Sequence, residues 1–163
     1  MSFIAPRLNS FDYRGEYRYS LTFCTLNRER YFEDEENVRV ALTQIGRAAD
    51  VEGFDVPIYC FMPDHFHWLA IGRSSPSQLQ RLIKTSKQLT GYAHRQRTGT
   101  QLWQRSGWDH VLRRDEDTPA VVKYILSNPV RAGLVEREED YPSSGSLTHS
   151  RGELFDFLRR ART

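Results

Sequence analysis

Alternating and helically spaced apolar positions divide the first half of the chain into short strands and one amphipathic helix. Residues 18–26 alternate and are rich in β-forming side chains, which predicts a first strand. The acidic residues 33–36 precede apolar positions at helical spacing, which predicts a helix. Pro63-Asp64 separates the apolar runs 56–62 and 65–71, so we expect two strands joined by a tight turn.

The second half of the chain shows two further helices with a strand between them. Ser75-Pro76 is an N-cap and first-turn pair, which predicts a helix over residues 76 to about 96. Residues 109–113 are expected to form a fourth strand. A helix is expected from Thr118-Pro119, interrupted or ended at Asn128-Pro129. The order β-α-β-β-α-β-α predicts an α+β fold, a ferredoxin-like split βαβ sandwich with an antiparallel sheet and helices on one face.

Length and composition favour one globular domain. We expect that domain to cover residues 1–145, followed by a polar tail, 146–163, with a short amphipathic helix around Leu154. No apolar run approaches the roughly 18–20 residues of a membrane span, and the start of the chain lacks the apolar core of a signal peptide. We therefore expect a cytoplasmic protein without a membrane partner, in which Cys24 and Cys60 are buried, reduced thiols.

Charge is distributed unevenly, although the net charge is only +2. Residues 65–108 contain no acidic residue. Their basic residues are Arg73, Arg81, Lys84, Lys87, Arg95, Arg97 and Arg105. The acidic residues gather in other segments, such as 33–36 and 136–140. Such segregation predicts a positive face and a polyanionic partner.

Two histidines flank one bulky residue in the segment His65-Phe66-His67. Side chains alternate between the two faces of a strand, so His65 and His67 are expected to point the same way and Phe66 the opposite way. Two neighbouring imidazoles can share one divalent ion. A pair of polar residues on a solvated sheet face is the alternative, and a third ligand and a group to activate are needed to make the pair a site.

Tyr124 and Asn128 are four residues apart, so they are expected on the same face of the last predicted helix. The amide oxygen of Asn128 is a candidate third ligand beside the two imidazoles. An ion held there would polarise a phosphodiester, and the phenol of Tyr124 would attack the phosphorus. A tyrosine that only packs on the domain is the alternative.

These segments resemble a known family. Residues 62–69 resemble the HUH motif (His, bulky hydrophobic, His) of single-tyrosine transposases, and residues 124–135 resemble the tyrosine-helix motif of the REP-associated tyrosine transposases. Further similarities lie at residues 17–24, 103–113 and 141–144, so that the resemblance runs over about residues 11–145. In related insertion-sequence transposases a glutamine, one methylene longer, stands where Asn128 does.

The resemblance implies a Mg²⁺- or Mn²⁺-dependent single-stranded DNA endonuclease and strand transferase that cuts near imperfect palindromes folded as hairpins. It implies that His65, His67 and Asn128 hold the metal. Tyr124 would be the nucleophile and would form a 5′-phosphotyrosine intermediate, and members act as monomers or homodimers. DNA-binding residues are then expected in the basic segment and at two tryptophans. They are Arg81, Lys84, Lys87, Arg95, Arg97, Arg105, Trp103 and Trp108.

Three other functions fit parts of the same pattern. A replication initiator or relaxase would share the histidine pair, but the first strand and the single tyrosine fit the transposase branch better. A catalytically inactive regulator that binds nucleic-acid hairpins would not need both histidines and Tyr124. A metal hydrolase that uses water would need a carboxylate base, and Asp64 is the one adjacent acid.

Overall fold

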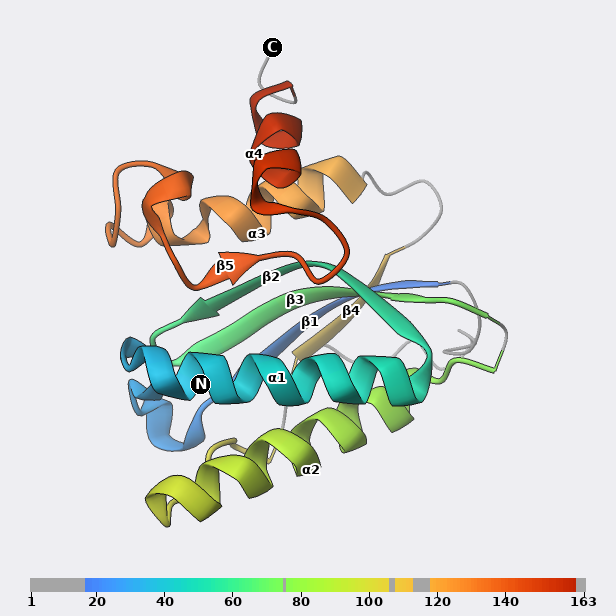
Figure 1. Ribbon diagram of the computed structural model, residues 1–163, viewed down its shortest axis with the longest axis vertical. Helices are drawn as coiled ribbons and strands as arrows, with labels where there is room; N and C mark the ends of the chain where they lie inside the picture. Colours follow the sequence, from blue (N-terminus) through green and yellow to red (C-terminus); the bar gives the residue numbers. More distant parts are fainter. Residues whose placement is uncertain (1–16, 75, 106–107, 113–117, 161–163) are drawn as a thin grey trace.

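A five-stranded antiparallel sheet organises the protein (Figure 1). The computed structural model describes residues 17–74, 76–105, 108–112 and 118–160, with the backbone alone for 108–112. The strands are β1 Arg18–Cys24, β2 Phe54–Met62, β3 His65–Gly72, β4 Trp108–Leu112 and β5 Ser144–Gly145, in the spatial order β4-β1-β3-β2-β5. The helices are α1 Glu35–Glu52, α2 Leu79–Thr98, α3 Thr118–Arg131 and α4 Arg151–Arg160.

The first four strands and two helices confirm the predicted ferredoxin-like fold. The order β4-β1-β3-β2 with α1 and α2 as the two crossovers is the split βαβ arrangement. The expectation that helices cover one face was too narrow. Helices α1 and α2 lie against one face of the sheet, and α3 and α4 lie on the other (Figure 1).

Strand alternation builds a separate apolar core on each face. Phe66 and Trp68 of β3 pack with the buried stripes of α1 and α2, which include Ile45 and Leu82. Leu69 of β3 packs on the opposite side, with residues of β2, α3 and α4. His65 and His67 have the same parity as Leu69, so the fold places both histidines on the face toward α3.

The predicted boundaries of β1 and α2 were wrong. Strand β1 ends at Cys24 rather than residue 26, and a short 3₁₀ turn follows. Helix α2 begins at Leu79, with Gln78 in the N-cap position, and not at residue 76. Pro76 lies in a turn that precedes the helix, and Ser75 lies outside the described residues.

Helix α3 continues through Pro129, which we had expected to interrupt or end it. A proline lacks the N–H that would bond one turn back, but near the end of a helix only one such bond is lost. The chain then leaves the helix through Gly133, whose φ of +75° lies in the left-handed region that glycine adopts freely. The continuation keeps Asn128 and Arg131 on the same helix as Tyr124.

The tail forms the expected amphipathic helix, α4. Leu154, Phe155 and Leu158 are buried against Val122, Ile125 and Leu126 of α3, which fixes α3 from its outer side. The division of the chain at residue 145 stays a prediction. No helix among the described residues is both long and apolar enough to cross a membrane.

Candidate functional site

The two histidines lie side by side in the middle of the sheet. Strand β3 is paired on both sides, so each histidine has a neighbour on β1 and another on β2. His65 lies between Cys24 and Met62, and His67 lies between Thr22 and Cys60. The imidazoles therefore stand on a rigid, hydrogen-bonded platform that faces α3.

Asp64 fixes the orientation of His65. Its Oδ1 atom lies 2.9 Å from Nδ1 of His65, and its Oδ2 atom accepts a 2.9 Å bond from Nε of Arg28. Burial lowers the pKa of His65, and the neighbouring carboxylate only partly offsets this effect. A neutral His65 that donates from Nδ1 presents the lone pair of Nε2 toward α3, as metal-ligating histidines do.

The second imidazole, His67, is almost fully buried. Its Nε2 atom lies 3.3 Å from the hydroxyl of Ser20 on β1. Burial, assisted by the neighbouring His65 and the cationic Arg131, lowers the pKa of His67 to about 4. His67 is therefore neutral at physiological pH, and its ring can act as a ligand without first losing a proton.

Helix α3 places the tyrosine and the asparagine over the two histidines. The ring of Tyr124 is 57% exposed, and its centre lies 6.1 Å from that of His67 in an edge-to-face arrangement. One turn later, Nδ2 of Asn128 lies 3.5 Å from Nε2 of His65. The structure thus brings together the four residues that the sequence singled out.

The donor set of this site fits a divalent ion. Within the described residues no group of three or more His, Cys, Asp and Glu side chains could hold a metal, so an ion here would need a ligand of another type. The amide of Asn128 is suitably placed at His65. A half-turn of that amide exchanges its nitrogen and oxygen, so that the same position presents Oδ1 to the ion. Imidazoles with a neutral oxygen favour Mn²⁺ over Mg²⁺, which prefers oxygen ligands alone.

The structure places the predicted DNA-binding residues of α2 on the far face of the sheet from the histidines. Leu79 and Leu82 of α2 pack in the core under α1. The positive segment is also less free than its sequence indicates, because an acid and an amide from α1 bind two of its arginines. Arg81 pairs with Glu52 at 3.1 Å, and Arg97 donates to Asn37 of α1 at 2.6 Å. Lys84 and Arg95 are exposed on α2, as is Arg105 beyond it.

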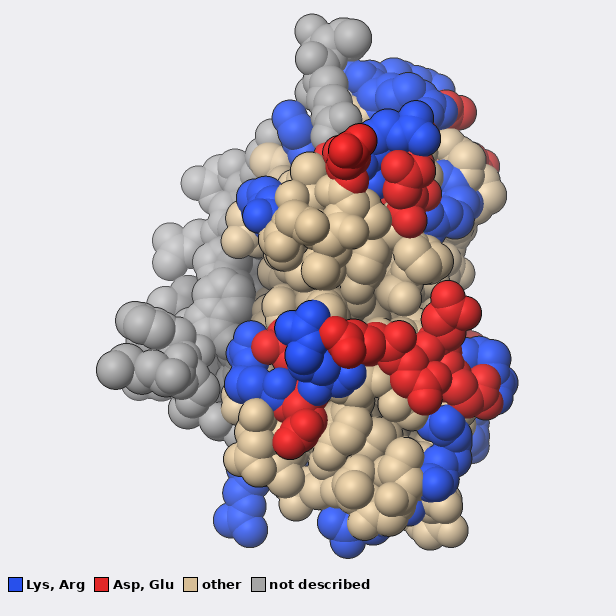
Figure 2. All heavy atoms as spheres, turned by 90° about the vertical axis from the view of Figure 1, so that its left-hand side faces the viewer, with Lys and Arg blue, Asp and Glu red and all other residues tan. Residues whose placement is uncertain are grey.

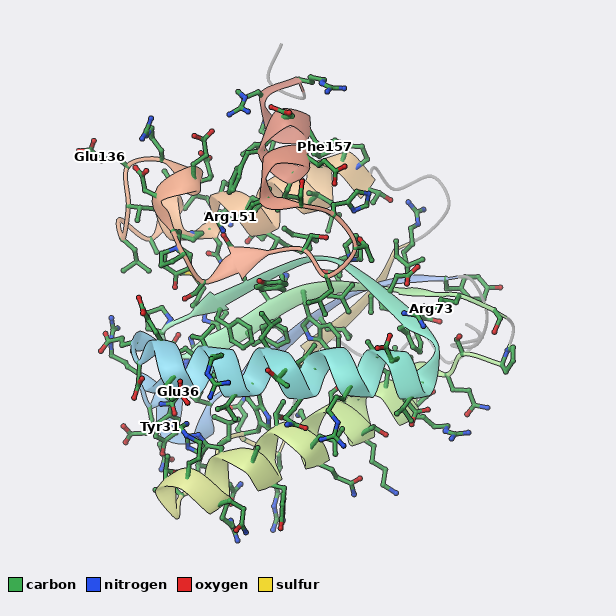
Figure 3. The ribbon with its side chains drawn as sticks, in the orientation of Figure 1. Tyr31, Glu36, Arg73, Glu136, Arg151 and Phe157 are labelled. Atoms are coloured by element: carbon green, nitrogen blue, oxygen red, sulfur yellow. The ribbon has the colours of Figure 1, made fainter. Side chains whose placement is uncertain are left out.

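Arg73 is another basic residue of this segment that is paired with acids. Arg73, labelled in Figure 3, donates to Asp55 at 2.7 Å and to Asp50 at 3.0 Å. On the side of the molecule shown in Figure 2, acidic and basic side chains lie next to one another, with a band of Asp and Glu level with the start of α1. That side is therefore not uniformly positive.

The structure tests only one of the two tryptophans that were predicted to stack on bases. Trp103 is 5% exposed, contacts Phe23 edge-to-face at 5.4 Å, and donates from Nε1 to the hydroxyl of Thr90 at 2.7 Å. Trp103 is therefore a core residue, and its ring is not available for stacking. The side chain of Trp108 lies outside the described residues.

Three functional neighbours escaped the sequence analysis. Asp64 was considered only as a turn residue or as the base of a hydrolase, and Arg28 and Arg131 were given no functional role. The guanidinium carbon of Arg131 lies 3.9 Å from the centre of the Tyr124 ring. The spacing of seven residues from Tyr124, two turns of a helix, was the available signal for Arg131. Arg28 and Asp64 are 36 residues apart, and only the tertiary structure brings them together.

Two curated bacterial proteins are similar to this chain in sequence. A REP-associated tyrosine transposase of Escherichia coli K12 is 33% identical over 94 residues, which cover 56% of this chain and 53% of that protein. A Haemophilus influenzae protein assigned to the same group is 28% identical over 114 residues, covering 63% of this chain and 64% of its own length. The match thus spans less than two thirds of either relative.

A solved structure shares the fold. It is described as a REP-associated tyrosine transposase bound to a REP hairpin, and it superposes with a TM-score of 0.70 at 22% identity over 86% of this chain and 82% of that one. These similarities confirm the resemblance drawn from residues 62–69 and 124–135. The family model for IS200-like transposases matches residues 14–127. The chain therefore belongs to the IS200-like transposase family.

Proposed function

We propose that this protein is a metal-dependent single-stranded DNA endonuclease and strand transferase that uses Tyr124 as its nucleophile. The observation that carries the proposal is the position of α3 over the histidine pair. Tyr124 stands against His67, and Asn128 stands against His65. A nucleophile and a candidate set of metal ligands therefore meet at one exposed point of an otherwise buried sheet face.

The proposed reaction exchanges one phosphodiester for another. Tyr124 gives up its phenolic proton, and its oxygen attacks the phosphorus of the scissile phosphate. The bond from phosphorus to the 3′ oxygen breaks, and that oxygen takes up a proton to leave as a 3′-hydroxyl. A 5′-phosphotyrosine remains, and a 3′-hydroxyl can later attack it and release the tyrosine. The bond energy is kept, which allows strand rejoining as well as cutting.

The surrounding residues orient the reacting groups. Asp64 keeps His65 in one tautomer, and Ser20 contacts the ring of His67. Arg131 covers the ring of Tyr124 and brings a positive charge to the place where the phosphate must approach. When bound by His65, His67 and Asn128, a divalent ion would supply Lewis-acid polarisation of the phosphate oxygens.

Hairpin DNA is the substrate that the relatives suggest. The similar solved structure is described as bound to a REP hairpin, and two curated relatives carry the REP-associated name. We propose the same substrate class here, imperfect palindromes with single-stranded flanks. A transposase that acts on genomic DNA would work in the bacterial cytoplasm.

The experiment that tests the proposal is a covalent-adduct assay. Labelled single-stranded hairpin DNA from the sequences that flank the gene is incubated with protein and Mn²⁺ or Mg²⁺, then separated on a denaturing protein gel. Wild type and Tyr124→Phe are compared. The expected result is an adduct that needs metal and appears in wild type only.

Two results would contradict the proposal in different ways. DNA cleavage that persists in Tyr124→Phe would show that another group is the nucleophile. Tight hairpin binding without adduct or cleavage in wild type would favour the regulatory hairpin-binding function instead. Tyr31→Phe, at a tyrosine that packs against His94, is the matched control and should form the adduct like wild type.

A further inference from the structure

A groove lined by basic residues and an exposed tyrosine lies outside the histidine site, between α2 and residues 101–105. It encloses about 350 Å³, which is within the range of small-ligand sites. Lys87, Gly91 and Arg95 follow one another at intervals of four along the wall that α2 provides, so they lie in one row. Gly91 makes a gap in this row, because a Cβ atom there would meet nothing within 4 Å.

The cations of this groove have no acidic partner among the described residues. Lys87 lies over the ring of Phe23 at 4.9 Å, and burial lowers its pKa. Arg95 and Arg105 are exposed. Arg81 and Arg97, by contrast, are engaged by Glu52 and Asn37. A partly desolvated ammonium without a counter-ion is stabilised when an anion arrives.

An aromatic ring stands at the same groove. Tyr92 is 68% exposed, and no ring among the described residues packs on it. A single exposed tyrosine is ordinary. Here the exposed ring, the gap at Gly91 and three cations coincide, and this combination fits a chain of alternating phosphates and flat bases.

The groove lies on the face of the sheet opposite the histidines, and residues 102–104 connect its wall to the edge of β1. The backbone N–H of Gln104 donates to the carbonyl of Cys24 at 3.0 Å, and Leu26 donates to Leu102 at 2.9 Å. Cys24 pairs with His65 across β1 and β3. Residues 102–104 are therefore about two strand spacings, roughly 10 Å, from His65. A strand that runs from the groove to Tyr124 must pass around this edge, so its path is longer than the roughly three stacked nucleotides that span about 10 Å.

We propose that this groove binds unpaired nucleotides of the DNA strand adjacent to the cut, with a base on Tyr92 beside Gly91 and phosphates on Lys87, Arg95 and Arg105. The inference rests on the proposed function for the strand's path, but the binding itself does not require cleavage. An acidic peptide would satisfy the cations but would leave the exposed ring and the adjacent gap unused.

The test measures equilibrium binding in the Tyr124→Phe background, where no adduct forms. Fluorescein-labelled dT12 is compared with a 12-residue abasic strand and a 12-base-pair duplex. Tyr92→Leu should weaken dT12 binding by about 5- to 150-fold and leave the abasic strand unchanged. Lys87→Gln should weaken dT12 and the abasic strand and reduce the salt slope for single strands by about 0.7.

Three further variants make the result specific. Gly91→Leu fills the gap with a better helix former, so it should fold and still lose dT12 affinity. Tyr92→Phe keeps the ring and should retain affinity. Arg47→Gln removes an exposed cation on α1 and should have no effect on dT12. Thermal unfolding of each variant verifies that it is folded.

Each outcome separates the groove from the proposed chemistry. Equal dT12 affinity in Tyr92→Leu, Gly91→Leu and wild type would overturn the groove assignment, even if the adduct forms. Equal losses for dT12 and the abasic strand in Tyr92→Leu would overturn base stacking, and binding of an acidic peptide in competition with dT12 would overturn the choice of partner. If the groove variants lose dT12 binding while the protein with an intact Tyr124 forms no adduct, the groove is supported and the nuclease is rejected.

Discussion

The guanidinium carbon of Arg131 lies 3.9 Å from the centre of the Tyr124 ring, two helical turns earlier on α3. Arg131 also donates from Nη1 to the hydroxyl of Ser127. His67 meets the same ring edge-to-face. The nucleophile proposed here is thus exposed to solvent but held between a cation and an imidazole, which limits the rotamers that it can adopt.

Replacing Arg131 should slow formation of the phosphotyrosine. Arg131→Gln removes both the stacked cation and the charge near the incoming phosphate, so we expect a fall of about 10- to 100-fold in the single-turnover rate. Arg131→Lys should restore part of the rate. Lys123→Gln, on the same helix, is the control. A wild-type rate in Arg131→Gln would show that the contact has no catalytic role.

Replacing Asp64 should weaken metal binding through His65. Burial alone would raise the pKa of Asp64, but hydrogen bonds from His65 and Arg28 outweigh it and lower that pKa. Asp64→Asn keeps the shape and removes the charge, and we expect Mn²⁺ affinity, measured by calorimetry, to fall about 10- to 100-fold. Arg28→Gln removes the ion pair with Asp64 and the hydrogen bond to Sγ of Cys24 but keeps the Asp64 carboxylate, so it should bind Mn²⁺ nearly as wild type does. Unchanged affinity in Asp64→Asn would show that the charge of Asp64 does not contribute to metal binding.

The choice of metal should follow from the ligand types. Chelation with EDTA should abolish adduct formation, and Mn²⁺ should restore it at lower concentration than Mg²⁺ because imidazole ligands suit Mn²⁺ better. His65→Ala and His67→Ala should remain inactive with either ion. Tyr124→Phe should bind Mn²⁺ as tightly as wild type. Adduct formation in EDTA would contradict the proposed role of the metal.

Acid should destabilise the protein through His94. The ring of His94 packs against Tyr31 at 4.6 Å and its Nε2 lies 3.0 Å from the hydroxyl of Thr100. Figure 3 labels Tyr31 near the start of α1. Burial, followed by the positive charge of Arg97, lowers the pKa of His94. A lowered histidine pKa means that the unfolded chain binds the proton more tightly, so the stabilisation is complete above about pH 6.5 and is lost as pH falls.

The measurement is urea unfolding from pH 7.5 to 4.5 in EDTA. Wild type should lose stability faster than His94→Gln below about pH 6.5, by at most about 1.4 kcal/mol for each pH unit, until the folded-state pKa is reached. The remaining histidines are common to both proteins and cancel in the comparison. Parallel curves over the whole range would show that His94 is not the titrating group.

The sequence by itself determined the order of the helices and of the first four strands, though not β5, and it identified the proposed catalytic residues. Periodicity is a local property, so the helical spacing of Val38, Ala41 and Ile45 and the alternation around His65-Phe66-His67 predicted α1 and β3 without reference to the rest of the chain. Tyr124 and Asn128 shared a helix face for the same reason. The end of α3 was mispredicted, because a proline in a last turn costs one bond and not the helix.

Only the tertiary structure decided what surrounds those residues. The contacts from Arg28 to Asp64 and from Ser20 to His67 join segments that are distant in the chain, and no local pattern encodes them. The pairing of Arg81 with Glu52 and the burial of Trp103 follow from how α2 packs. Both side chains are therefore less available to DNA than the sequence of the basic segment indicates. Periodicity shows which side of an element is buried, whereas the partner on that side is set by the packing of the whole chain.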